Sequence, residues 1–175
     1  MKTSYSAPSS APGPASGSRV WVAPNRRAVS RRAATGSLTV TTVDTRETLI
    51  QNGTVDTVFA TYSITPERAK KVAFAGPYYR SGNAVMVLSE NSTISSAKDL
   101  AGKKVAMQQG STTPASLKKV APTAVPSLFP DDAQCLAALK TKRVDAYVID
   151  QGILVSNAST DPSLKVVGEP FDDDF

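Results

Sequence analysis

Apolar and polar positions alternate in short blocks after the first 36 residues, and these blocks predict alternating strands and helices. Two segments rich in β-branched residues, 37–43 and 55–61, are predicted to be strands, and a helix is expected over 46–51 between them. A strand–helix–strand order is typical of an α/β layer with parallel strands. The pattern therefore predicts an α/β fold from the start of the apolar region.

The second half of the chain continues the same alternation. The continuous apolar run 83–89 predicts a strand that is buried on both faces. Asp131 and Gln134 form a capping-box pattern, which predicts the start of a helix. Further strands are expected over 104–108, 125–128 and 143–150, and further helices over 96–102, 114–120, 131–142 and 151–157.

One segment of the first half combines several groups that can bind an anion. Thr65 is a suitable N-cap and Pro66 fits the first helical position, so a short helix is expected to begin here. The hydroxyls of Thr61 and Ser63 lie just before this helix, and the guanidinium of Arg68 is one turn into it. Free backbone N–H groups, hydroxyls and a planar fork together suit a small carboxylate. An ordinary capped surface helix has the same local pattern, and both interpretations stay open.

A second turn rich in donors follows the strand predicted over 104–108. It carries Gly110 and the hydroxyls of Ser111 and Thr112, and Thr113 with Pro114 predicts the cap and first residue of a helix. In open α/β sheets, ligands bind at the carboxyl ends of strands, where both turns are expected to lie. Two such turns on separate α/β units suggest a ligand held between two lobes, although each turn alone is also compatible with a plain helix cap.

Asp150 ends a buried apolar strand and is expected at the same end of the sheet as the two turns. Its carboxylate is either the N-cap of the helix predicted over 151–157 or a counter-ion for an ammonium group. The local sequence does not distinguish the two roles.

Charge is distributed unevenly along the chain. The net charge is +5, but residues 1–37 hold six basic residues and no acidic one, whereas the remaining 138 residues hold 14 basic against 15 acidic residues. The apolar part is thus nearly neutral and does not suggest a nucleic-acid-binding domain. Residues 1–36 are rich in Ser, Ala, Pro and Gly, lack the apolar stretch of a signal peptide, and are predicted to be a disordered basic tail.

Residue types exclude several kinds of catalytic site. The chain has no histidine, which excludes His-based triads and His-ligated metal sites, and no Gly-rich phosphate loop is visible. Cys135 is the single cysteine and is expected to be buried and unpaired. We expect no catalytic residue, no metal and no cofactor.

Several motifs carry a resemblance to a known family. Residues 50–79, I-Q-N-G-T-V-D-x-V-x-A-T-Y-S-I-T-P-E-R-x-K-x-V-x-F-A-G-P-Y-Y, resemble the family 3 solute-binding proteins of polar amino-acid ABC transporters. The later runs D-L-A-G-K-K-V-A-x-Q-x-G-S-T, C-L-A-A-L-K-T-K-R-V-D-A-Y-V-I-D and L-K-V-V-G-E-P-F are similar to the second lobe of the same family. The glutamate-type proteins of actinobacteria are the most similar subgroup, and the motifs occur in the right order over residues 41–175.

This resemblance implies a type II periplasmic-binding-protein-like fold of two α/β lobes joined by two crossing strands. The implied division is a disordered tail over 1–36, a partial first lobe over 37–80, a second lobe over 81–166, and the start of the return crossing over 167–175. It also implies an extracellular or cell-surface, monomeric protein that delivers an amino acid to an ABC transporter permease and binds no nucleic acid.

The family also implies roles for individual residues. Arg68 would grip the ligand α-carboxylate, helped by the first-lobe hydroxyls, while the second lobe would add further donors and a carboxylate for the α-ammonium. The implied ligand-binding residues are Thr61, Ser63, Arg68, Ser111, Thr112 and Asp150. The resemblance does not choose the ligand side chain: glutamate, glutamine, aspartate and basic amino acids are bound within this family.

The chain departs from the family pattern at both ends. Relatives begin with a signal peptide and with the first strand and helix of lobe one, and they finish lobe one after the second crossing. Ala106 also stands where glutamate-type relatives often have a second cysteine. We therefore expect the first lobe to be incomplete and amino-acid affinity to be weak or absent.

Three alternatives to a working binding protein remain. A dehydratase on the same architecture would need a general acid–base group, for which Glu67 is the nearby candidate. A nucleic-acid-interacting protein would use the basic tail and would show salt-sensitive binding. A non-functional gene remnant would give a disordered or aggregating product.

Overall fold

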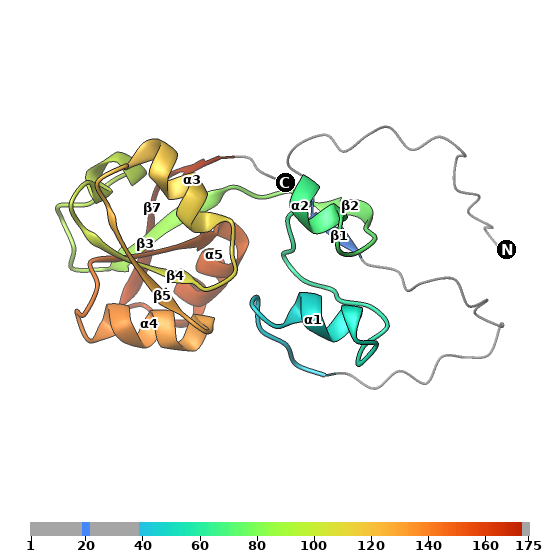
Figure 1. Ribbon diagram of the computed structural model, residues 1–175. Coiled ribbons are helices and arrows are strands. Elements are labelled where there is room, and N and C mark those ends of the chain that lie inside the picture. The colour runs from blue at the N-terminus through green and yellow to red at the C-terminus, as the bar shows by residue number, and fades with distance from the viewer. Residues whose placement is uncertain (1–18, 22–38, 173–175) are drawn as a thin grey trace, which may run out of the picture.

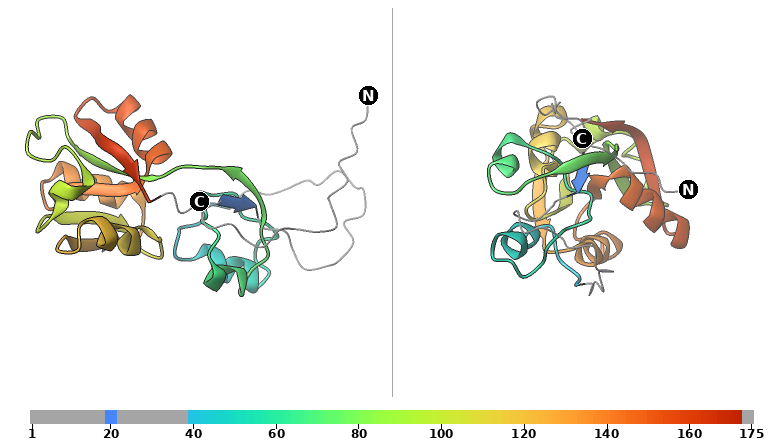
Figure 2. Two further views of the ribbon diagram at one scale, coloured as in Figure 1. Left: turned by 90° about the horizontal axis from the view of Figure 1, so that it is seen from above. Right: turned by 90° about the vertical axis from the view of Figure 1, so that its right-hand side faces the viewer.

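The computed structural model describes residues 19–21 and 39–172, which form two bodies joined by extended chain (Figures 1 and 2). The small lobe holds two helices and a two-stranded sheet, and the large lobe holds a five-stranded sheet with helices on both faces. The elements are β1 (Arg19–Trp21), α1 (Arg46–Gln51), α2 (Pro66–Ala69), β2 (Ala75–Tyr79), β3 (Asn83–Leu88), η1 (Ala97–Leu100), β4 (Lys104–Gln108), α3 (Thr113–Val120), β5 (Val125–Phe129), α4 (Asp132–Lys140), β6 (Ala146–Asp150), α5 (Gln151–Thr160) and β7 (Leu164–Phe171).

The large sheet is mixed, with the strand order β5-β4-β6-β3-β7. Strand β4 is parallel to both of its neighbours, whereas β3 is antiparallel to β6 and β7. The antiparallel register places Asn83, at the start of β3, opposite Asp150, at the end of β6. The carboxyl ends of β4 and β6 and the amino end of β3 therefore share one edge of the sheet, and the chain leaves for the small lobe from this edge.

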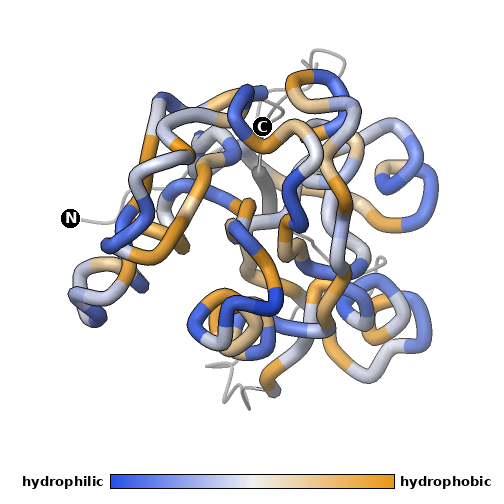
Figure 3. The backbone as a smooth tube through the Cα atoms, turned by 90° about the vertical axis from the view of Figure 1, so that its left-hand side faces the viewer, coloured by the Kyte–Doolittle hydropathy of each residue, from blue (hydrophilic) through white to orange (hydrophobic). Residues whose placement is uncertain are grey.

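Burial on both faces of the sheet explains the continuous apolar runs in its central strands. Along β3, Ala84 and Met86 pack into the core on the α4–α5 face, while Val85 and Val87 pack into the core beneath η1 and α3. Strand β6 divides its residues between the two faces in the same way. Figure 3 shows hydrophobic stretches alternating with hydrophilic ones along the surface helices. The predicted strand over 83–89 is confirmed as β3.

The small lobe is built around Tyr62, which is completely buried. Its ring meets Phe74 edge to face, with ring centroids 5.2 Å apart, and Val72 belongs to the same core. Two arginine side chains cover the remainder of this ring, as described below. The core of the small lobe is thus centred on a tyrosine ring whose surface contacts cations, whereas most cores are centred on aliphatic side chains.

The strands predicted over 37–43 and 55–61 are wrong for the residues that the structure describes, since residues 37 and 38 lie outside the described ranges. Residues 39–43 run from irregular chain into a turn, and residues 55–61 are irregular throughout. A strand is stabilised by hydrogen bonds to a neighbouring strand, and among the described residues no strand lies beside either segment. Both segments are rich in β-branched residues, which favour strands. Whether a strand forms also depends on a neighbouring strand that is distant in the sequence, and the local pattern does not show one.

The segment predicted to be a disordered tail contributes one described element. Residues Arg19–Trp21 form β1, which pairs antiparallel with β2, with Arg19 opposite Tyr79. For these three residues the expectation of disorder differs from the structure. The other positions of the segment 1–36 lie outside the described residues.

The helix start at Asp131 follows the predicted capping chemistry, and a second helix start, at Ser96, has capping hydrogen bonds of the same kind. The Asp131 carboxylate accepts a hydrogen bond from the backbone N–H of Gln134 at 2.8 Å, at the start of α4. Asp99 accepts hydrogen bonds from the backbone of Ser95 at 3.0 Å and Ser96 at 2.9 Å at the start of η1. Cys135 is buried in the core as predicted, and burial raises the pKa of its thiol to about 12.

Candidate functional site

The start of α2 is built as the sequence predicts. Thr65 is the N-cap, and its hydroxyl accepts a hydrogen bond from the backbone N–H of Arg68 at 3.2 Å. Pro66 occupies the first helical position, where the absence of an N–H has no cost. The single-turn helix directs the Arg68 side chain toward the large lobe rather than into solvent, so the arginine is buried, with 8% of its surface exposed.

Arg68 connects the two lobes. Its Nη1 donates to the backbone oxygen of Ser63 at 3.0 Å, and its Nη2 donates across the lobe boundary to the backbone oxygen of Gly110 at 2.9 Å. Its Nε lies 3.5 Å from Oε1 of Glu47. A guanidinium has five N–H donors, so one N–H on each terminal nitrogen remains for a ligand. Burial lowers the pKa of Arg68, and the negative charge of Glu47 opposes this shift.

A second buried arginine stands beside Arg68. Arg46, the first residue of α1, is 3% exposed, and its Cζ lies 3.8 Å from the centroid of the Tyr62 ring, while Cζ of Arg68 lies 4.8 Å from the same centroid. Its Nη1 donates to the backbone oxygen of Thr61 at 3.4 Å. Burial, followed by the positive charge of Arg68, lowers the pKa of Arg46 to about 10. Both side chains remain cationic at neutral pH.

The turn after β4 supplies the large-lobe side of the site. Gly110 adopts the left-handed φ of +75°, and a Cβ there would lie 3.0 Å from the backbone Cα of Asp44 in the small lobe, so glycine permits this close approach. Ser111 donates through its hydroxyl to the backbone oxygen of Gln108 at 2.7 Å. The N-cap of α3 is Thr112, one residue earlier than predicted, and Thr112 makes no side-chain capping hydrogen bond. The Thr113 hydroxyl donates to the side chain of Asn83 at 3.2 Å.

Asp150 occupies the N-cap position of α5, but its side chain makes no capping hydrogen bond. The carboxylate is 3% exposed and lines the same cleft as Arg68. The simple capping role that the sequence left open therefore does not explain why an acidic residue stands here. An anionic group in the wall of a cleft is consistent with the alternative, a counter-ion for a bound cation.

A narrow cleft between the lobes brings these groups together, and it encloses about 280 Å³ including its open mouth. All of the predicted site residues line it, together with residues that the sequence analysis did not select. The lining consists of Val43, Arg46, Thr61, Ser63, Arg68, Asn83, Gln108, Ser111, Thr112, Thr113, Ile149 and Asp150. The structure thus places the predicted residues side by side, and their role as ligand-binding groups stays a prediction.

Sequence reasoning missed Arg46, Asn83 and Gln108. A cation at the first residue of a helix opposes the helix dipole, and this mismatch at Arg46 was the one available signal. The side chain of Gln108 is fixed by a hydrogen-bond network in the large lobe. Its Nε2 donates to the hydroxyl of Tyr147 at 3.1 Å, and that hydroxyl donates to Asp132 at 2.9 Å. Such a network depends on three separate elements and leaves no local pattern in the sequence.

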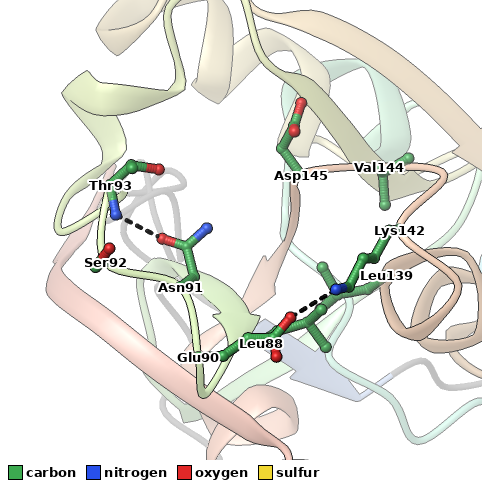
Figure 4. Close-up of a pocket in the computed structure, with 9 residues that line it drawn as sticks. All are labelled: Leu88, Glu90, Asn91, Ser92, Thr93, Leu139, Lys142, Val144 and Asp145. Carbon is green, nitrogen blue, oxygen red and sulfur yellow. Dashed lines mark hydrogen bonds and ion pairs between the residues drawn. The ribbon is translucent and has the colours of Figure 1, made fainter.

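A wider hollow lies at the opposite end of the large sheet (Figure 4). It is lined by residues at and after the end of β3 and by residues from α4 to the start of β6. Of its charged side chains, Lys142 Nζ lies 2.8 Å from Oε1 of Glu90, and the Asp145 carboxylate accepts a hydrogen bond from the backbone N–H of Lys104 at 2.8 Å. The Asn91 side chain accepts a hydrogen bond from the backbone N–H of Thr93 at 3.0 Å. Because these polar groups are satisfied within the protein, the narrow cleft between the lobes is the better candidate site.

Comparison with known proteins identifies the family. Residues 33–160 match the family described as bacterial extracellular solute-binding proteins, family 3. The chain is 35% identical over 134 residues to the ABC transporter glutamine-binding protein GlnH of Bacillus subtilis, covering 76% of this chain and 49% of that protein. It is 36% identical over 137 residues to the glutamate-binding protein GluB of Corynebacterium efficiens, covering 74% and 47%.

Solved structures show the same fold. The ancestral amino acid-binding protein AncCDT-1, a precursor of cyclohexadienyl dehydratase, aligns with a TM-score of 0.66 and 34% identity, covering 75% of this chain and 60% of that chain. The chain belongs to the family 3 bacterial extracellular solute-binding proteins, and its fold is the type II periplasmic-binding-protein fold. It spans about half the length of the curated relatives that it matches. No helix in the described ranges has the length and apolar character that a membrane crossing needs.

Proposed function

We propose that this protein binds an L-α-amino acid in the cleft between its lobes and delivers it to the membrane permease of an ABC transporter. Arg68 holds the α-carboxylate and Asp150 holds the α-ammonium. The hydroxyls of Thr61, Ser63, Ser111 and Thr112 supply further donors around the carboxylate. The observation that carries the proposal is that a buried guanidinium and a buried carboxylate line one narrow cleft between two lobes.

The electrostatics of the cleft suit a zwitterion. A buried charge is expensive unless it is paired, and pairing with a ligand of opposite charge recovers part of that cost. The free N–H groups of Arg68 can form charge-assisted hydrogen bonds to two carboxylate oxygens. Glutamate is the first candidate, since the glutamate-binding protein GluB is among the relatives. The description of the family supports an extracellular location, and the proposal requires one copy of the chain and no nucleic acid.

The test is a thermal-shift screen of the purified chain against the twenty common amino acids. A ligand at about 100 times its dissociation constant stabilises the native state by about 2.7 kcal/mol. Binding should be lost in Arg68→Ala and in the isosteric Asp150→Asn, and retained in Arg143→Ala, whose exposed cation lies outside the cleft. A cooperative melt that no amino acid shifts would contradict the proposal.

A weakly binding form of the same protein is the second candidate, and the surface of the small lobe favours it. Val40, Phe59 and Tyr78 are 97%, 65% and 52% exposed, so three large apolar side chains of the small lobe face solvent. A small lobe with so much apolar surface would hold its half of the cleft less rigidly, and affinity depends on such preorganisation. Titration to millimolar ligand concentrations separates weak binding from none.

An enzyme on the same fold is the third candidate, because AncCDT-1 is a precursor of a dehydratase. Glu67, the acid–base candidate from the sequence, is exposed and does not line the cleft. A general acid or base must reach the reacting group directly or through one water. The geometry therefore supports binding over catalysis, and turnover of prephenate or arogenate by the purified chain would reverse this preference.

A further inference from the structure

Arg46 is a buried cation in the wall of the cleft that the proposed clamp for the α-amino and α-carboxylate groups does not use. It is 3% exposed and lines the cleft with Arg68 and Asp150. Burying a guanidinium costs several kcal/mol unless hydrogen bonds and an opposite charge compensate it. What compensates Arg46 therefore decides whether it is a structural group or a binding group.

The protein itself compensates the charge of Arg46 only in part. Its Nε is buried and has no hydrogen-bond partner, and the hydrogen bond from its Nη1 to the backbone oxygen of Thr61 is long at 3.4 Å. Within the described part of the chain no carboxylate forms an ion pair with it. The adjacent acid, Glu47, lies 3.5 Å from Arg68 and 3.0 Å from Lys71 instead. The Tyr62 ring lies against the Arg46 guanidinium, and Tyr62 and the negative charge of Glu47 offset only part of the burial that lowers the pKa of Arg46.

We propose that Arg46 receives the side-chain carboxylate of an acidic amino acid and is the residue that gives the cleft its preference for one. This inference rests on the proposed function. Arg68 and Asp150 match the charges common to all α-amino acids, which leaves Arg46 as an additional positive charge in the wall. A ligand with a second carboxylate supplies the missing anion, whereas a neutral or basic side chain leaves the buried guanidinium uncompensated.

The placement of the two guanidinium groups fits such a ligand. Both Cζ atoms lie within 4.8 Å of the same Tyr62 ring centroid, so they are less than twice that distance apart. The ring fixes both groups by cation–π contact, which limits the side-chain entropy lost when a ligand binds. Two cations held at a short separation form a receptor for a short dicarboxylate.

The experiment is isothermal titration of the full chain with L-glutamate, L-aspartate, L-glutamine and L-asparagine. The wild type should bind the better acid about 10- to 100-fold more tightly than its amide, the range expected of one charge-assisted interaction. Arg46→Gln should remove this preference while changing the affinity for the amide by less than about threefold. Arg46→Lys, which keeps the charge, should restore part of the preference, and Arg143→Gln should have no effect.

Each contrary outcome has a definite meaning. If the wild type prefers the amides, or if Arg46→Gln weakens acids and amides equally, Arg46 is only a structural partner of Tyr62 and the inference is wrong, while the proposed amino-acid site stands. If no amino acid binds the wild type, the proposed function fails and this inference fails with it. Circular dichroism melts of the ligand-free variants show whether any loss of affinity reflects unfolding.

Discussion

Gly168 in β7 and Gly102 after η1 form a natural pair for measuring how tightly the large lobe is packed. Their φ angles are nearly equal, +69° and +71°, both in the left-handed region. A Cβ at Gly168 would lie 2.9 Å from the backbone oxygen of Ser95 and 2.9 Å from Cα of Ser96. A Cβ at Gly102 would have nothing within 4 Å. Substituting each by alanine thus adds the same backbone strain but only one steric clash.

The expected losses of stability follow from these two terms. A left-handed conformation costs a non-glycine residue about 1–2 kcal/mol, so Gly102→Ala should lower the free energy of unfolding by about that amount. Gly168→Ala should lose a further ~1–3 kcal/mol, as overpacked sites do, because the clashing atoms belong to the backbone and cannot rotate away. The expected difference between the two variants is therefore the clash alone.

Urea unfolding followed by far-UV circular dichroism measures both free energies. The m-values of the two variants should match that of the wild type, so that a change in midpoint reports stability. Equal losses in the two variants would refute the close approach of β7 to Ser95 and Ser96. Losses below about 0.5 kcal/mol in both would refute the left-handed backbone at both glycines.

Two further predictions concern the large lobe. Tyr147→Phe should destabilise the protein by about 1–3 kcal/mol, because its hydroxyl joins Gln108 to Asp132 in a buried network, and urea unfolding would contradict this role if the two proteins were equally stable. The Lys140 ion pair and hydrogen bonds from Ser163 lower the pKa of Asp161 to about 2. The ionised carboxylate therefore stabilises the fold above the unfolded pKa of ~4, and this stabilisation is lost as the pH falls toward 2. Melting temperatures between pH 5 and pH 2 should fall less steeply for Asp161→Asn, and an identical slope would contradict the assignment.

Local chemistry was sufficient to predict the elements whose signals lie within a few residues. The cap at Thr65, the proline that follows it and the cap at Asp131 depend on contacts three residues apart, and the structure has them as predicted. The apolar run of β3 was equally readable, since burial on both faces removes the polar alternation. The six site residues were predicted from the family resemblance, together with the rule that ligands bind at the carboxyl ends of strands.

The features that sequence reasoning missed depend on partners distant in the chain. Segments 37–43 and 55–61 have strand composition, yet the described residues give them no neighbouring strand. The burial of Arg46 follows from its packing on Tyr62, sixteen residues later, and a helix-start position gives no indication of it. Gln108 is fixed by a tyrosine 39 residues away. In each case the sequence shows the residue type, but it does not show the long-range contact that gives the residue its role.

The hydrogen bond from Arg68 to the backbone oxygen of Gly110 has a consequence for how strongly any solute can be held. The group that is proposed to grip the ligand also donates to Gly110 across the lobe boundary, so this contact favours the closed arrangement of the lobes whether or not an amino acid is bound. An incoming amino acid must then find the fraction of molecules that are open, and its apparent dissociation constant rises in inverse proportion to that fraction. Each 1.4 kcal/mol by which the closed form is more stable than the open form would raise the apparent dissociation constant about tenfold. If the proposed delivery to a permease is right, a closed molecule without ligand would have the same outline as a ligand-bound one, and the strength of this contact would set how often the permease meets such a molecule.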